Sequence, residues 1–154
     1  PSKTKVSPPP VVAAELTNNA SDAGELPTML QAVHDNLGVL PEQALADTGY
    51  KAEAVFEALA GSGCELVVAL GREGKTALRF DSERSPHTAA MAARLQTDEG
   101  RAAYRRRKWI AEPPNGWIKN VLGFRQFSLR GLHRVQAEWK LVCLALNLRR
   151  MATM

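Results

Sequence analysis

Two carboxylates stand out because of the residues around them. Glu112 lies in the stretch Tyr104-Arg-Arg-Arg-Lys-Trp-Ile-Ala-Glu112-Pro-Pro, and residues 101–150 hold twelve Lys or Arg but only two acids, Glu112 and Glu138. Nearby cations favour the charged form of a carboxylate, so Glu112 should stay ionised at neutral pH, in a form that could act as a metal ligand while the cations hold a polyanion. The alternative is a solvated basic helix with an incidental glutamate, which is what most charge runs are.

The second carboxylate, Asp47, follows the short apolar run 43–46 and precedes Thr-Gly-Tyr50. The run is consistent with a buried strand, and an acid at the carboxyl end of such a strand lies where α/β sheets place ligand groups. Its alternative role is the N-cap of the next helix. The three histidines are scattered, and Cys64 and Cys143 have apolar neighbours that indicate reduced core thiols rather than a metal pair or a disulfide.

The net charge of +4 is unevenly distributed along the chain. Residues 1–100 hold eight basic and fourteen acidic side chains, whereas residues 101–154 hold twelve and two. This asymmetry predicts a polyanion-binding face on the C-terminal part, with nucleic acid favoured over an anionic membrane surface. No run approaches the roughly 18 apolar residues that span a bilayer, and the N-terminus lacks the apolar stretch of a signal peptide, so we expect a cytosolic protein.

The first half of the chain alternates between helix-type and strand-type patterns. A disordered proline-rich leader is expected over 1–10 and a β-type run over 11–17. Ser21 and Asp22 form an N-cap signal for a helix that ends near Gly38, and a second amphipathic helix follows over 51–60. The apolar run 64–70 is bounded by glycines and predicts a strand, so the alternation indicates an α/β sheet with some parallel pairing.

The second half is predicted to be mostly helical. A surface insertion is expected over 71–97, a Glu112-bearing helical region over 98–122 and a C-terminal helix over 131–150. Pro113 and Pro114 predict a helix boundary or kink near Glu112; if the helix continues, Lys119 shares a face with Glu112. An apolar stripe on the last helix either covers the chain's own core or pairs two copies of the chain; its members are Leu132, Val135, Trp139, Val142 and Leu146.

Several of these pieces, taken in order, resemble bacterial insertion-sequence transposases of the DDE class. The residues that carry the resemblance are Leu45-Ala-Asp47-Thr-Gly-Tyr50 and Tyr104-Arg-Arg-Arg-Lys108…Glu112-Pro113…Gly116…Ile118-Lys119. Val12-Ala-Ala-Glu-Leu-Thr17 upstream and Gly123-Phe-Arg-Gln-Phe127 downstream add to it, as does the tail from Trp139 to Arg149. The resemblance covers about residues 11–150, which would then form a partial DDE domain.

The resemblance implies a ribonuclease-H-like α/β fold with a short central sheet, flanking helices and a helical C-terminal third. In such enzymes two Asp and one Glu bind two divalent ions, usually Mg²⁺ and in some cases Mn²⁺, that activate the attacking oxygen and stabilise the leaving oxygen. Asp47 would be the second acid and Glu112 the third, both as metal ligands and catalytic residues. The implied partners are DNA phosphates of transposon ends and target, bound by Arg105, Arg106, Arg107, Lys108, Lys119, Arg125 and Arg130.

The resemblance also implies departures. Its register puts the first Asp near Lys5, and no acid precedes Glu15, so we expect an incomplete domain that lacks strand transfer by itself and binds metal poorly. Pro114 and Asn115 stand where the family favours an aliphatic and an aromatic residue. The alternative function is a non-enzymatic DNA-binding or inhibitory fragment of a decayed element. Either form would act in the bacterial cytoplasm at the nucleoid, alone or as a homodimer.

Overall fold

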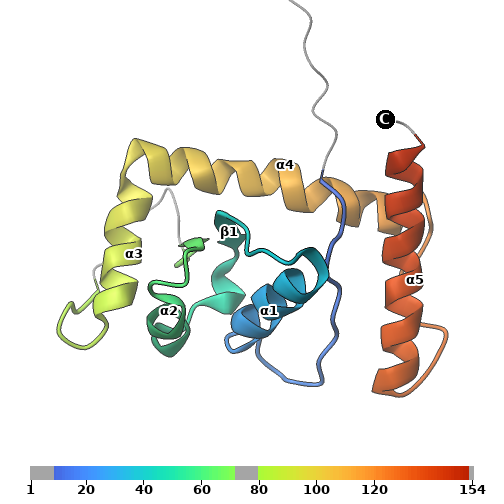
Figure 1. Ribbon diagram of the computed structural model, residues 1–154, viewed down its shortest axis with the longest axis horizontal. Helices are drawn as coiled ribbons and strands as arrows, with labels where there is room; N and C mark the ends of the chain where they lie inside the picture. Colours follow the sequence, from blue (N-terminus) through green and yellow to red (C-terminus); the bar gives the residue numbers. More distant parts are fainter. Residues whose placement is uncertain (1–8, 72–79, 153–154) are drawn as a thin grey trace, which may run out of the picture. The chain divides into compact units, whose positions relative to one another are not determined.

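The computed structural model describes residues 9–71 and 80–152. Within them the chain is mixed α/β, with five α-helices, a short 3-10 helix and a two-stranded parallel sheet (Figure 1). It divides into two compact units: Asn19–Arg107 forms the central unit, and the described residues before and after it form the terminal unit. Most of the predicted leader and part of the predicted insertion, residues 1–8 and 72–79, lie outside the described residues.

The central unit begins with α1 (Glu25–Leu37), the first predicted helix. It ends at Gly38, whose φ of 74° suits a residue without a side chain and whose N–H donates to the His34 carbonyl at 2.7 Å. The predicted cap is wrong, because Gly24 occupies the N-cap position and no side chain caps the helix there. Asp22 is therefore available for another role.

The sheet consists of β1 (Gln43–Ala46) and β2 (Glu65–Val68), which are parallel, with Ala46 opposite Val68. This confirms both predicted strands and the parallel pairing. Val67 and Val68 are 0% exposed, so β2 is buried on both faces. Burial on both faces explains why its sequence is a continuous apolar run rather than an alternating one.

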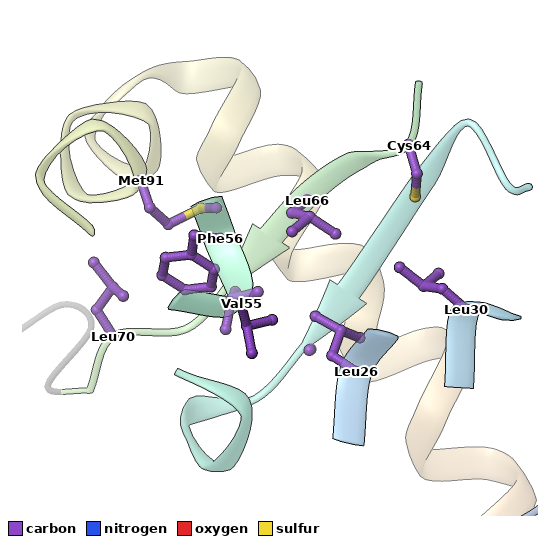
Figure 2. Packing of buried hydrophobic residues seen from close by; sticks show 10 residues of the cluster. Leu26, Leu30, Val55, Phe56, Cys64, Leu66, Leu70 and Met91 are labelled. Carbon is purple, nitrogen blue, oxygen red and sulfur yellow. The ribbon is translucent and has the colours of Figure 1, made fainter. Parts of the chain in front are cut away.

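Helices of the central unit cover the sheet and share its core. Figure 2 shows Leu26 and Leu30 of α1 facing the strands, and Phe56 of α2 (Glu53–Leu59) next to Met91 of α3 (Pro86–Gln96). Cys64 belongs to the same cluster, and it and Cys143 are buried free thiols, as predicted. Burial raises the pKa of both thiols, which keeps them protonated and unreactive.

A carboxylate joins α2 to α3. Glu53 accepts hydrogen bonds from the backbone N–H groups of His87 and Thr88 at 2.8 Å, and from the Thr88 hydroxyl at 2.6 Å. Burial opposes ionisation of Glu53, but these hydrogen bonds outweigh it, so its pKa lies below the ordinary value. Glu53 of α2 thus accepts hydrogen bonds from N–H groups in the first turn of α3. It takes the place of a capping side chain within α3 itself.

The terminal unit contains the C-terminal part of α4 (Asp98–Asn120) and all of α5 (Leu132–Met151). Ile118 of α4 forms a buried cluster with Val142 and Leu146 of α5, and Trp139 packs against it. The apolar stripe predicted on the last helix is therefore used within the chain along much of its length.

The predicted strand over 11–17 is wrong, because these residues do not form a strand and instead hydrogen-bond to side chains of α5. Asn147 accepts from the Val11 N–H at 2.8 Å and donates to the Val11 carbonyl at 2.7 Å. Gln136 does the same for the Leu16 N–H and the Ala14 carbonyl, both at 2.6 Å. Side-chain amides thus replace the neighbouring strand that residues 9–17, called the strap below, would need in a sheet.

The predicted helix boundary near Glu112 is also wrong, because α4 continues through Pro113 and Pro114 to Asn120. Each proline removes one N–H, which leaves a carbonyl four residues earlier without its helical partner. These carbonyls belong to Trp109 and Ile110, two residues on an exposed stretch of the helix. Exposure lowers the cost of two prolines inside this helix.

Candidate metal and nucleic-acid site

Asp47 lies directly after β1, at the carboxyl end of the strand. Its Oδ1 accepts a hydrogen bond from the Gly49 N–H at 3.0 Å and caps the 3-10 helix Thr48–Tyr50. Its side chain is 54% exposed. Asp47 therefore caps the 3-10 helix, and it also stands at the strand end where a ligand group was expected.

Asp22 lies beside Asp47, and sequence reasoning did not identify it as a site residue. A Cβ built on Gly49 would be 3.1 Å from Oδ1 of Asp47 and 3.2 Å from Oδ2 of Asp22. One oxygen of each carboxylate thus lies close to Gly49. No periodicity links a loop residue before α1 to the end of β1, so only the folded chain reveals the pair.

This part of the central unit is negatively charged. Burial raises the pKa of Tyr50, and the charges of Asp22, Asp47 and Glu25 raise it further, in that order. The opposing cation is Arg107, whose guanidinium lies 4.0 Å from Oδ2 of Asp47. A hard divalent cation prefers oxygen ligands of this kind.

Glu112 belongs to the terminal unit, where it is exposed on α4. The continuous helix puts Lys119, seven residues later, on the same face as Glu112, and both Lys119 and Lys108 are exposed. The carboxylate of Glu112 has no ion pair among the described residues. The other acid of residues 101–150, Glu138, hydrogen-bonds to the backbone of the chain.

Glu138 holds the connector between α4 and α5. It accepts from the Ser128 N–H at 2.9 Å and from the Leu129 N–H at 3.1 Å. The hydrogen bond from the Ser128 backbone is the main reason that the pKa of Glu138 lies below its ordinary value. Of the two acids in residues 101–150, Glu138 is occupied by these hydrogen bonds, so Glu112 is the one available to bind a ligand.

The predicted DNA-binding side chains are mostly on the surface. Arg105 is exposed, and Arg106 donates to the Gln43 side chain at 2.8 Å. Arg107 is half-buried, next to Asp47 and 5.5 Å from the Tyr104 ring centroid. Arg125 and Arg130 are exposed in the connector.

The described part of the chain contains no group of three or more His, Cys, Asp or Glu side chains placed to hold a metal ion. Asp22 and Asp47 form a pair in the central unit, and Glu112 is described within the terminal unit alone. The pair fits a hard cation by its oxygen chemistry.

Comparison with known proteins places the chain in a family. Residues 40–152, well over half of the sequence, match the family model described as "Transposase DDE domain". The match includes Asp47, Glu112 and every basic residue discussed above, whereas Asp22 precedes it. No curated protein and no solved structure matches the chain. Among the described residues, no helix is both long and apolar enough to cross a membrane. The chain belongs to the transposase DDE domain family.

Proposed function

We propose that this chain takes part in DNA transposition, with Asp47 and Glu112 as metal-binding catalytic carboxylates. The observation that supports the proposal is the position of Asp47, at the carboxyl end of the parallel strand β1, whose last residue Ala46 is buried, inside the family match that also includes Glu112. The fold that this proposal expects is ribonuclease-H-like, with β1 and β2 as part of its central sheet. Its place of action is the bacterial cytoplasm, on the DNA of the nucleoid.

Mg²⁺ or Mn²⁺ at this site would help to activate the attacking oxygen and stabilise the leaving oxygen in phosphodiester cleavage and strand transfer. The chain's own residues would position the ion and the DNA. Asp47 is held in place by the Gly49 N–H, and Glu112 is presented on a continuous helix. Cleavage requires Glu112 to join Asp47 around the ion.

DNA binding would come from the exposed cations of α4 and the connector. Lys108 and Lys119 lie on either side of Glu112 along α4, so a DNA phosphate bound by them would be close to that carboxylate. Contacts of this kind do not depend on base sequence and weaken as salt rises. They would hold transposon ends and target DNA alike.

A second candidate is a non-enzymatic DNA-binding protein. The Arg107–Asp47 ion pair favours it, because a cation already lies next to the carboxylate. In that case the carboxylates would stabilise the fold, and the basic residues would bind DNA without any metal ion.

A single experiment distinguishes the two. Purified chain is incubated with labelled DNA duplexes at several Mg²⁺ or Mn²⁺ concentrations, and binding and cleavage are measured for the wild type, Asp47→Asn and Glu112→Gln. The transposase proposal predicts that the ion increases binding or permits cleavage, and that both substitutions abolish this effect. Binding that is independent of the ion and unchanged in both variants would establish the second candidate instead.

A further inference from the structure

We propose that the groove between α5 and the connector, residues 121–131, binds an unpaired nucleotide of DNA, with the base against an apolar wall and a phosphate on Arg125. The inference rests on the proposed function, because that function supplies DNA as the ligand. It adds a contact to a base, whereas the DNA contacts proposed above are to phosphates.

The groove lies within the terminal unit and has a volume of about 770 Å³. Pockets that hold small ligands have volumes of about 300–1,000 Å³. Leu122 and Leu141 in its lining are 42% and 65% exposed, so a ligand can reach them from solvent. The apolar wall consists of Leu122, Phe124, Leu141, Val142 and Ala145.

Phe124 gives this wall an aromatic ring that is already held in place. Its centroid lies 5.4 Å from that of Phe127, in an edge-to-face arrangement, and 6.3 Å from that of Trp139. Trp139 in turn packs against the buried cluster of the terminal unit. Proteins that bind single strands use aromatic rings of this kind to stack with bases.

Two polar side chains of the groove are available to a ligand. Arg125 and Gln126 are exposed, and neither has an ion pair or a side-chain hydrogen bond within residues 9–71 and 80–152. A guanidinium binds phosphate oxygens, and an amide can both donate to and accept from the edge of a base. Glu138, the acid in the lining, already accepts from the N–H groups of Ser128 and Leu129, so it fixes the wall.

This combination favours a nucleotide over an apolar protein segment. A covering apolar segment would remove Arg125 from water without supplying an opposite charge, which is costly. A base within a duplex is stacked and paired, whereas the ring of an unpaired nucleotide can lie against the wall. The twelve cations and two acids of residues 101–150 attract a polyanion of this kind.

The test measures binding of labelled DNA to the full chain by fluorescence anisotropy, without divalent ions. The ligands are a short single strand, an abasic strand of the same length that keeps the phosphates, and a duplex. Leu141→Glu blocks the wall, and Arg125→Gln removes the cation. Leu148→Glu and Arg134→Gln make the same changes at exposed positions of α5 outside the groove lining. Circular dichroism verifies that each variant is folded.

We expect the wild type to bind the base-bearing strand about tenfold or more tightly than the abasic strand. Leu141→Glu should remove this difference, and Leu148→Glu should keep it. Because Arg125 contacts a phosphate, Arg125→Gln should weaken binding of both strands, and by more than Arg134→Gln does.

Equal binding of the two strands by the wild type, or a difference that persists in Leu141→Glu, would overturn the base site. If duplex binding is retained in that case, the proposed function stands. Persistence of the difference together with loss of self-association in Leu141→Glu, measured by sedimentation, would assign the groove to a second copy instead. Equal effects of Arg125→Gln and Arg134→Gln would overturn the phosphate contact. A wild type that binds none of the three ligands would overturn the inference and the proposed function together.

Discussion

The Arg107 guanidinium lies 4.0 Å from Oδ2 of Asp47, whereas Oδ1 of the same carboxylate accepts a hydrogen bond from the Gly49 N–H at 3.0 Å. Arg107 also lies over the Tyr104 ring, which fixes it in this direction. If Asp47 binds a divalent ion as proposed, the positive charge of Arg107 would repel that ion and compete with it for the carboxylate.

The first prediction concerns this competition. Arg107→Gln removes the repulsion and should tighten Mn²⁺ binding to the chain. The matched control is Arg106→Gln, which changes the net charge equally but removes a hydrogen bond to Gln43 instead of the ion pair with Asp47. Calorimetric titration of both variants checks it; equal affinities in the two would contradict a specific effect of Arg107.

The second prediction concerns the pH dependence of stability. Because the pKa of Glu53 is lowered in the folded chain, its ionised form stabilises the fold above the ordinary value of 4.5, and this contribution is lost as the pH falls through the folded pKa. Glu53→Gln should therefore be less stable than wild type at pH 7, with a difference that shrinks on acidification. Urea unfolding at several pH values measures this.

The control for Glu53 is Glu57→Gln, an exposed acid on the same helix. It should follow the wild-type pH profile. A difference between wild type and Glu53→Gln that stays constant from pH 7 to pH 3 would show that the carboxylate charge is not what holds the start of α3.

The third prediction concerns the strap. Asn147→Ala removes two hydrogen bonds to the Val11 backbone, worth about 0.5–1.5 kcal/mol each. Hydrogen exchange of the Val11 and Leu16 amides should become faster in this variant. Asn120→Ala, an exposed asparagine at the end of α4, is the control; the same exchange rates in both variants would mean that Asn147 does not hold the strap.

The fourth prediction concerns DNA binding. If Lys108 and Lys119 each neutralise one phosphate, replacing both with Gln should reduce the slope of log K against log salt by about 1.8. Replacing Lys51 and Arg84, two exposed cations of the central unit, removes the same charge and should leave the slope unchanged. Equal slopes for the two double variants would argue against a specific DNA-binding face on α4.

The elements that could be predicted are those whose burial shapes their sequence. β1, β2 and α5 were found from an apolar run or stripe, because these residues pack against a core. Residues 11–17 were mistaken for a strand because they form a short β-type run, whereas their partners are the side-chain amides of Gln136 and Asn147, which give no pattern in the sequence.

The site was predictable only in part. Asp47 was identified from its place after an apolar run, and Glu112 from its contrast with the basic residues around it. Asp22 was missed because its proximity to Asp47 depends on how the loop before α1 folds back on the end of β1. The helix boundary that Pro113 and Pro114 predicted near Glu112 was wrong, because the helix continues through both prolines along an exposed stretch of the chain.

The central claim is that Asp47 and Glu112 bind the same divalent ion. The most direct test is paramagnetic broadening of amide NMR signals when a small amount of Mn²⁺ is added to the labelled chain. The claim predicts broadening at Gly49 and at Glu112, reversed by excess Mg²⁺ and lost in Asp47→Asn. Broadening that spares either Gly49 or Glu112, or that persists in Asp47→Asn, would contradict it.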